Sequence, residues 1–174
     1  MIEKTLNLGQ IRSSLFSGND SKTEAGFAVS GVGDVNKDGY DDYLIGARSY
    51  SKYAGAAFLV YGGPSMPDSL TPETLGSQGV VFYGYNRSYT GWDVSGLGDV
   101  NRDGYADFMI GSPSPGSKGT CHVIFGGRSL PSSVSLSSLG SYGVTIGSES
   151  LSHDLGYAVT KVGDVNNDGY ADIL

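Results

Sequence analysis

Short apolar runs separated by polar, glycine-rich segments recur along the chain, and no stretch of about 11 residues has the spacing of an amphipathic helix. The first set of runs covers residues 26–35, 43–47, 56–63 and 80–84, and the second covers residues 91–100, 108–112, 121–127 and 144–148. Runs of this length, bounded by Gly, Pro, Ser and Asn, are typical of β-strands. The pattern therefore predicts an all-β protein with four short strands per set, and a helical turn only around residues 72–75.

The two sets, and a shortened third one, repeat with a fixed period. Asp34 and Asp99 lie 65 residues apart, and so do Asp99 and Asp164. Each set begins with a glycine followed by an aromatic residue, and an acidic turn follows its first run. Four strands and one such turn per unit, at a fixed period, are the pattern of a β-propeller blade. We therefore expect β-propeller blades of four antiparallel strands.

The period divides the chain into parts of a single propeller segment, residues 1–174. These parts are the end of a preceding unit (1–25, of which residues 6–18 align with an outer strand), two units (26–90 and 91–155) and a truncated unit (156–174). A closed propeller has about four to eight blades. The sequence therefore predicts a piece of a larger propeller. The alternative is that several copies associate through open strand edges to close a ring.

Composition agrees with this fold class. Glycine supplies 28 of the 174 residues and tyrosine 12, whereas only 17% of the residues are charged, which favours short strands and glycine turns over helices. No run approaches the roughly 18 consecutive apolar residues of a transmembrane helix, so no membrane span is expected in this chain. The single cysteine, Cys121, excludes an internal disulfide.

The net charge of −7 comes from clustered acids. Nine of the 18 acidic residues occupy the repeated positions of the three acidic turns. An acidic chain without a basic stripe binds nucleic acid poorly, because phosphate contacts require Lys and Arg. Nucleic acid is therefore excluded as a partner.

Each acidic turn has the pattern Asp-x-Asn-x-Asp-Gly-Tyr-x-Asp, which we number one to nine. We call the three copies the first, second and third acidic loops. Alternate residues of a tight loop point inward, so oxygens at positions one, three and five converge, and the glycine at position six permits a left-handed turn. Position seven offers a backbone carbonyl and position nine a carboxylate. The candidate ligands are Asp34, Asn36, Asp38, Tyr40 and Asp42; Asp99, Asn101, Asp103, Tyr105 and Asp107; and Asp164, Asn166, Asp168, Tyr170 and Asp172.

This set of oxygen ligands favours Ca²⁺. Calcium accepts about six to eight oxygens at flexible angles, whereas Mg²⁺ requires a stricter octahedron, and the absence of His and Cys argues against zinc and copper. We expect about three calcium ions, one per loop, which would change the formal charge from −7 to −1. Without a cation the clustered carboxylates repel one another, so the loops are expected to be frayed until metal binds.

Three other interpretations of the loops remain. An EF-hand needs a bidentate Glu at position twelve and a following helix, but Ile45 and Ile110 occupy that position within strands. Dockerin modules contain a similar phrase, but they too continue into a helix and pair their loops much more closely. The loops could also be simple Asx-turns between strands. The metal interpretation is preferred over the last one because turn chemistry alone does not require an acid at position nine.

No set of residues indicates catalysis, and we expect no enzymatic activity. Cys121 and His122 are neighbours in a strand, so their side chains point to opposite faces and form no dyad. Tyr85 and Tyr89 lie in a loop between strands. Exposed tyrosines bind proteins or stack on sugar rings, whereas packing between blades is the simpler interpretation and is favoured here.

The glycine-aromatic start, the acidic loop and the strand that follows form one continuous motif. It reads GFAVSGVGDVNKDGYDDYLIGA (26–47), GWDVSGLGDVNRDGYADFMIGSP (91–113) and GYAVTKVGDVNNDGYADIL (156–174). This motif resembles the FG-GAP repeats of the integrin alpha-subunit β-propeller, although the closing Gly-Ala-Pro is degenerate: Arg48 replaces Pro, and Ser112 replaces Ala. The resemblance implies about seven blades in the complete propeller, Ca²⁺ in hairpin loops on one face, and partner-binding loops on the opposite face.

These observations lead to three hypotheses of function. The first is a calcium-binding propeller that serves as an extracellular or cell-surface interaction and adhesion module with a protein or glycan ligand. Loops without the bidentate Glu are expected to bind calcium with the weak affinities of extracellular modules, ~10⁻⁴ to 10⁻³ M. The second is a non-catalytic companion of an enzyme that acts on surface lipids or polysaccharides, as FG-GAP repeats are in glycosylphosphatidylinositol-specific phospholipase D. The third is a carbohydrate-binding propeller.

Overall fold

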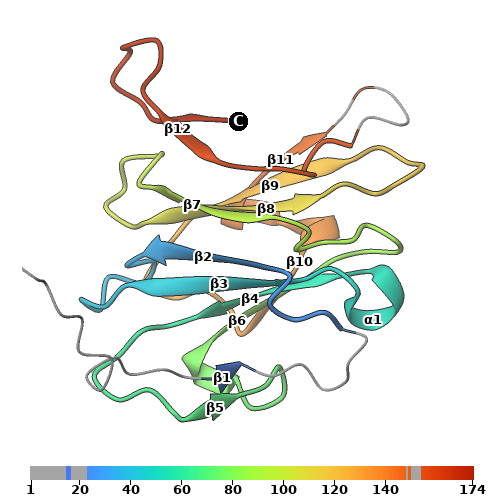
Figure 1. The fold of residues 1–174 in the computed structure, drawn as a ribbon. Coiled ribbons are helices and arrows are strands. Elements are labelled where there is room, and N and C mark those ends of the chain that lie inside the picture. The colour runs from blue at the N-terminus through green and yellow to red at the C-terminus, as the bar shows by residue number, and fades with distance from the viewer. Residues whose placement is uncertain (1–14, 17–22, 148, 150–153) are drawn as a thin grey trace, which may run out of the picture.

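Most strands of the protein lie in two sheets that stack face to face (Figure 1). The computed structural model describes residues 15–16, 23–147, 149 and 154–174. The first sheet has the order β10-β6-β4-β3-β2 and the second β11-β9-β8-β7. Their bounds are β2 (Ala28–Gly33), β3 (Asp42–Ala47), β4 (Ala56–Val60), β6 (Gly79–Tyr83) and β10 (Ser133–Ser135), then β7 (Val94–Gly98), β8 (Asp107–Ser112), β9 (Thr120–Ile124) and β11 (Gly143–Gly147).

Two smaller pairs of strands flank these sheets. They are β1 (Leu15–Phe16) with β5 (Ser69–Leu70), and β12 (Lys161–Gly163) with β13 (Asp172–Ile173). The hairpin of β12 and β13 lies beside the second sheet, in red in Figure 1. The residues proposed to end a preceding unit, 1–25, lie mostly outside the described residues, although β1 falls within the proposed outer strand, residues 6–18.

The fold class predicted from the sequence is confirmed. Strands β2, β3, β4 and β6 pair antiparallel in the first unit, and β7, β8, β9 and β11 repeat the arrangement in the second. Both units therefore have the four antiparallel strands of a propeller blade. In each unit the ladder has an irregularity just before the acidic loop, between Gly31 and Gly33 and between Gly96 and Gly98.

A fifth strand in the first sheet was not predicted. β10 belongs to the second unit, yet it pairs in parallel with β6, the outer strand of the first unit, with Val134 opposite Phe82. β1 pairs with β5 in the same parallel sense. The connector of the second unit thus lies across the outer strand of the preceding unit. Its Val134, Leu136 and Leu139 join the core between the two sheets.

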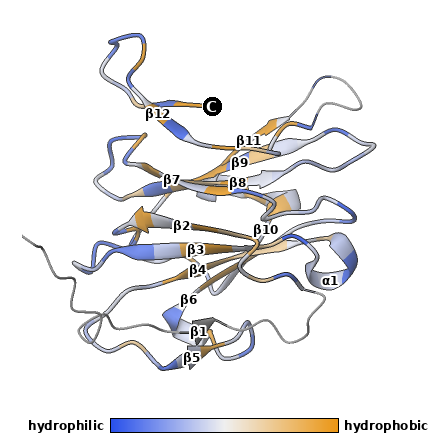
Figure 2. Ribbon diagram, viewed as in Figure 1, coloured by the Kyte–Doolittle hydropathy of each residue, from blue (hydrophilic) through white to orange (hydrophobic). Residues whose placement is uncertain are grey.

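That core is formed by apolar residues from both units. Leu44, Leu59 and Phe82 of the first sheet pack in one cluster with Phe108 and Ile110 of the second. The rings of Phe82 and Phe108 meet edge to face with centroids 5.4 Å apart. Figure 2 shows the hydrophobic residues concentrated on the strands. Burying one such side chain contributes about 1.5–3 kcal/mol, so the contact between units supplies much of the stability of each.

Among the residues that the structure describes, helical structure is limited to single turns. They are α1 (Tyr50–Tyr53) and the 3₁₀ turns η2 (Gly76–Gln78), η3 (Leu136–Ser138) and η4 (Gly140–Tyr142). The predicted turn around residues 72–75 is present, because the N–H of Thr74 donates to the carbonyl of Thr71 at 3.1 Å. Sequence patterning missed α1 because four residues are too few to show a period. In the part of the chain that the structure describes, no helix is long and apolar enough to span a membrane.

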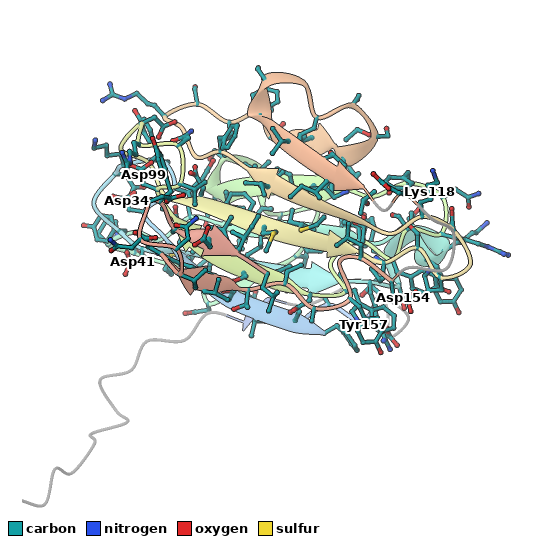
Figure 3. The ribbon with its side chains drawn as sticks, turned by 90° about the horizontal axis from the view of Figure 1, so that it is seen from above. Asp34, Asp41, Asp99, Lys118, Asp154 and Tyr157 are labelled. Carbon is teal, nitrogen blue, oxygen red and sulfur yellow. The ribbon has the colours of Figure 1, made fainter. Side chains whose placement is uncertain are left out.

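The strands run between two ends of the molecule that differ in chemistry. In Figure 3, Asp34 and Asp99 of the acidic loops lie at one end, and Lys118, Asp154 and Tyr157 lie at the other. This separation of the two ends follows from the antiparallel order of the strands. Every acidic loop connects the first two strands of its unit, and the next hairpin, which contains α1 in the first unit, turns at the other end. The fold therefore places all three acidic loops at the same end.

Candidate functional site

The first acidic loop is closed by side-chain hydrogen bonds to its own backbone. The two carboxylate oxygens of Asp34 accept the N–H groups of Asp38 at 3.0 Å and of Gly39 at 2.8 Å. The amide oxygen of Asn36 also accepts the N–H of Asp38, and Asp38 accepts the N–H of Tyr40, each at 3.0 Å. The side chains at positions one, three and five thus bind the backbone of their own loop.

The second and third loops repeat this network with distances that differ by no more than 0.1 Å. Asp99 accepts the N–H groups of Asp103 and Gly104, and Asp164 accepts those of Asp168 and Gly169. The backbone repeats as well. The residues at positions four and six have left-handed φ angles in all three loops: Lys37 61° and Gly39 93°, Arg102 63° and Gly104 90°, Asn167 60° and Gly169 87°. One local sequence therefore produces one local conformation three times.

Position nine behaves differently from the other positions. Asp42 is only 2% exposed, and its two oxygens accept the N–H of Val35 and the N–H of Gly62, both at 2.8 Å. Asp107 is fully buried and accepts the N–H groups of Val100 and Gly126, again at 2.8 Å. These carboxylates tie each loop to the residues that follow the third strand of the unit.

The sequence argument that turns do not require an acid at position nine is therefore wrong. The acid has a structural role without any metal, because it satisfies two backbone N–H groups that have no partner in the ladder. Burial raises the pKa of Asp42 to about 6, against the lowering effect of the hydrogen bonds from Gly62 and Val35. Burial also raises the pKa of Asp107. In the third loop Asp172 accepts the N–H of Val165 at 2.8 Å.

The described residues contain no group of three or more His, Cys, Asp or Glu side chains placed to hold a metal ion. The oxygens at positions one and five face backbone N–H groups, and the oxygens at position nine are turned to the unit core. A carboxylate oxygen with one hydrogen bond still has a lone pair available. The chemistry of the set therefore fits a hard cation, but three carboxylates would have to approach one another to bind it.

The opposite end of the molecule carries a continuous strip of aromatic rings. We call Phe27, Arg48, Tyr53, Tyr89, Trp92 and Tyr157 the aromatic strip. The guanidinium carbon of Arg48 lies 3.6 Å from the ring centroid of Phe27 and 4.5 Å from that of Trp92. Trp92 also contacts Tyr157, with centroids 4.7 Å apart. Phe27, Tyr53 and Tyr157 remain 44%, 51% and 54% exposed.

Sequence reasoning singled out only one member of this strip, Tyr89, together with Tyr85. The hydroxyl of Tyr85 is 2.7 Å from the Oγ1 of Thr120 in the second unit, so the packing interpretation is confirmed for Tyr85. Tyr89 instead stacks on Tyr53. The missed signal was the glycine-aromatic start of each unit, because this period places Phe27, Trp92 and Tyr157 at equivalent positions.

Cys121 and His122 lie in different surroundings, as their adjacent positions in a strand predicted. Cys121 packs in an apolar cluster with Leu97, Met109, Val123 and Val159, and burial raises the pKa of its thiol to about 12. His122 is 1% exposed, and its ring nitrogens lie 3.2 Å and 2.9 Å from the hydroxyls of Thr120 and Thr145. Both residues therefore contribute to packing between strands.

Comparisons with known proteins agree with the repeat structure. The family model of the FG-GAP repeat matches residues 90–124. The chain is 31% identical over 165 residues to phosphatidylinositol-glycan-specific phospholipase D of Bos taurus. This alignment covers 87% of this chain and 18% of that protein. It is 32% identical over 151 residues to integrin alpha-IIb and 30% identical over 175 residues to integrin alpha-8, both of Mus musculus. These alignments cover 82% and 91% of this chain.

The chain spans only 14% and 15% of the two integrin relatives, so the likeness concerns one part of each. The matched family segment begins at Thr90, next to Gly91 at the start of the second unit, and ends within β9. It includes the whole second acidic loop. Together with the propeller-type sheets, these matches show an FG-GAP repeat domain that is similar to part of the integrin alpha subunits.

Proposed function

We propose that this chain is a calcium-stabilised β-propeller module that binds a protein or glycan partner outside the cell. The observation that carries the proposal is the identical hydrogen-bond network and backbone in three acidic loops at one end of the molecule. A turn needs only one or two polar side chains to close. Here positions one, three, five and nine of each loop supply three carboxylates and an amide, which is a set of hard oxygen ligands.

Calcium would be held by the side chains at positions one, three, five and nine and by the backbone carbonyl of position seven. Because Asp42 and Asp107 each accept two backbone N–H groups, they supply only their remaining lone pairs to a cation. Hydrogen bonds must also be rearranged before the carboxylates converge. Both effects lower the affinity, in agreement with the weak binding of extracellular modules, ~10⁻⁴ to 10⁻³ M. Cytosolic calcium would not fill such sites, which supports an extracellular or cell-surface location.

The aromatic strip is the surface that we propose for the partner. It lies at the end opposite to the acidic loops and combines exposed rings with the guanidinium of Arg48. Aromatic and Arg side chains are enriched where protein interfaces bind most strongly. The strip extends over residues of all three units, from Phe27 to Tyr157, so the packing between units keeps the proposed binding surface together.

A calorimetric calcium titration of the chelator-treated protein tests the metal sites. We expect about three ions with the weak affinity given above, and Asp38→Ala, Asp103→Ala and Asp168→Ala should each remove one of them. The matched control is Asp68→Ala, which removes an exposed acid outside the loops and should leave the stoichiometry unchanged. Nanomolar affinity, or a loss of binding in the Asp68 variant, would contradict the proposal.

Binding to panels of purified extracellular-matrix proteins and of glycans tests the partner surface. Tyr53→Ala and Tyr157→Ala remove exposed rings of the strip and should weaken any specific binding by more than tenfold, the size of an interface hot spot of about 2 kcal/mol. Tyr142→Ala is the matched control, because this tyrosine is 38% exposed and lies in η4, outside the strip. Binding that survives both strip variants would place the partner elsewhere. Binding only to glycans would identify a carbohydrate-binding propeller.

A second candidate function follows from one comparison. The relatives named phosphatidylinositol-glycan-specific phospholipase D match 87% of this chain in Bos taurus and 86% in Homo sapiens. The propeller would then be the non-catalytic companion of an enzyme that acts on surface lipids or polysaccharides. Sequencing the complete transcript decides between the two proposals, because the second one requires a catalytic domain beside the repeats.

A further inference from the structure

The residue at position four of an acidic loop contacts the next acidic loop. The ammonium nitrogen of Lys37 lies 5.5 Å from the ring centroid of Tyr105, and the guanidinium carbon of Arg102 lies 3.8 Å from that of Tyr170. Both tyrosines occupy position seven, where the backbone carbonyl is a candidate ligand. The same contact therefore occurs twice, from the first loop to the second and from the second loop to the third.

Further contacts join consecutive loops at these points. Arg102 also donates a hydrogen bond from Nη2 to the backbone carbonyl of Gly169, at position six of the third loop. A Cβ atom added to Gly104 would lie 2.8 Å from the Lys37 ammonium nitrogen, so that lysine covers position six of the second loop. In addition, the N–H of Ala106 donates to the carbonyl of Asp34 at 3.2 Å.

Position four has a left-handed backbone in all three loops, including Asn167 of the third, so this conformation belongs to the loop itself. Lys37 and Arg102 have left-handed φ angles of 61° and 63°, a conformation that residues with long side chains rarely adopt. Among the described residues, neither cation forms an ion pair, but the charge of Arg102 adds to the hydrogen bonds from Tyr170 and Asn166 that lower the pKa of Asp168. The contacts of these two side chains are with the ring and backbone of the following loop.

We propose that Lys37 and Arg102 are positioning residues that hold the following acidic loop in its closed, hydrogen-bonded conformation, from which it binds a cation. This inference rests on the proposed calcium function and adds a coupling between consecutive loops to it. When a cation orders one loop, it also orders the position-four side chain of that loop, and this side chain then stabilises the next loop. Calcium binding is thus coupled between the first and second loops and between the second and third loops, and the coupling within each pair is reciprocal. The third loop has the neutral Asn167 at position four.

Hydrogen exchange followed by mass spectrometry tests the positioning role in calcium-free protein. Arg102→Gln should accelerate exchange in residues 163–172 about two- to fivefold, and Lys37→Gln should do the same in residues 98–107, which is the size expected of an exposed cation–π contact. Exchange in residues 33–42 should stay unchanged in the Arg102 variant, and exchange in residues 163–172 should stay unchanged in the Lys37 variant. Lys118→Gln removes an exposed cation at the opposite end (Figure 3) and serves as the matched control.

Rescue by a conservative change separates this role from a general loss of stability. Lys37→Arg keeps a cation over the ring of Tyr105 and should restore slow exchange in the second loop. Faster exchange in all three loops of a variant, or no change in the following loop, would overturn the proposal. Because this measurement needs no metal, it decides the positioning role even if the protein binds no calcium.

The coupling is tested by measuring calcium-dependent protection of residues 163–172 at graded calcium concentrations. Asp99→Ala, which removes a ligand of the second loop, should weaken calcium binding at the third loop about two- to fivefold. In the Arg102→Gln background the same substitution should have no further effect on the third loop. Equal effects in both backgrounds would overturn the coupling. Absence of calcium protection in the unmodified protein would overturn the proposed function and the coupling together.

Discussion

Asp93, in the second unit, accepts the backbone N–H of Val159, in the third unit, at 2.8 Å across 66 residues of sequence. Its other oxygen accepts the N–H of Val94. Among the glycine-aromatic starts, only the second carries an acid at this position; the others have Ala28 and Ala158. Asp93 therefore links the beginning of one propeller unit to the beginning of the next.

Replacing Asp93 with alanine should loosen the third unit. The N–H of Val159 would lose its acceptor at a half-buried place, which costs about 1–3 kcal/mol. Hydrogen exchange at Val159 and across residues 160–174 should accelerate, with little change in the first unit. The matched control is Asp154→Ala, an exposed acid close to the same segment. Unchanged exchange at Val159 would show that the bond contributes nothing to the contact between units.

Alanine in place of Gly46 should disturb the contact between the first two units. A Cβ atom at this position would lie 2.2 Å from the carbonyl oxygen of Gly91, which starts the second unit. Overpacking of this kind lowers the free energy of unfolding by about 1–3 kcal/mol. Gly63→Ala is the matched control, because its Cβ meets nothing within 4 Å. Thermal unfolding of both variants measures the difference, and equal midpoints would refute the steric explanation.

Asp42 and Asp38 should differ sharply in their contribution to calcium-free stability. Asp42→Ala leaves the buried N–H groups of Val35 and Gly62 without an acceptor, at a cost of about 1–3 kcal/mol each. Asp38→Ala removes an exposed side chain, so it should change the unfolding free energy by less than about 0.5 kcal/mol. Urea unfolding in the presence of chelator compares the two. A larger loss in the Asp38 variant would contradict the structural role of position nine.

His122 should make the protein less stable as the pH falls below 6.5. Burial lowers the pKa of His122 from 6.5 to about 4 in the folded protein, so between these values the unfolded chain binds a proton that the folded chain does not. The contribution is complete above pH 6.5 and is lost progressively toward pH 4, on the order of 3 kcal/mol at 1.36 kcal/mol per pKa unit.

The comparison that isolates this effect is between the unmodified protein and His122→Gln. Asp42 acts in the opposite direction, because its pKa is raised from 3.8 to about 6 and the folded protein takes up that proton first, which favours folding as the pH falls. Both proteins retain Asp42, so its contribution cancels in the difference. The difference in unfolding free energy between the two proteins should shrink from pH 7 to pH 4. A difference independent of pH would show that His122 is not held neutral.

Local patterns predicted much of this molecule. Alternating apolar runs and glycine-bounded turns specify antiparallel strands joined by hairpins, because each strand pairs with its neighbour in sequence. The acidic loops were equally predictable, since the bonds from Asp34 to the N–H groups of Asp38 and Gly39 span only four and five residues. The three copies adopt one conformation because their short-range interactions are the same.

Contacts across the units could not be predicted in this way. Three of these contacts join different units: the hydrogen bond from Val159 to Asp93, the parallel pairing of β10 with β6, and the contact of Phe27 with Trp92. A fourth, the hydrogen bond from Gly62 to Asp42, joins the ends of two successive strands within one unit. Sequence spacing alone does not state which side chain faces which neighbour. By itself the sequence determined the repeated strands and the loop conformation through local bonds. Only the tertiary structure decided that position nine is buried, that cations link successive loops and that aromatic rings gather at one end, because these features depend on how the units stack.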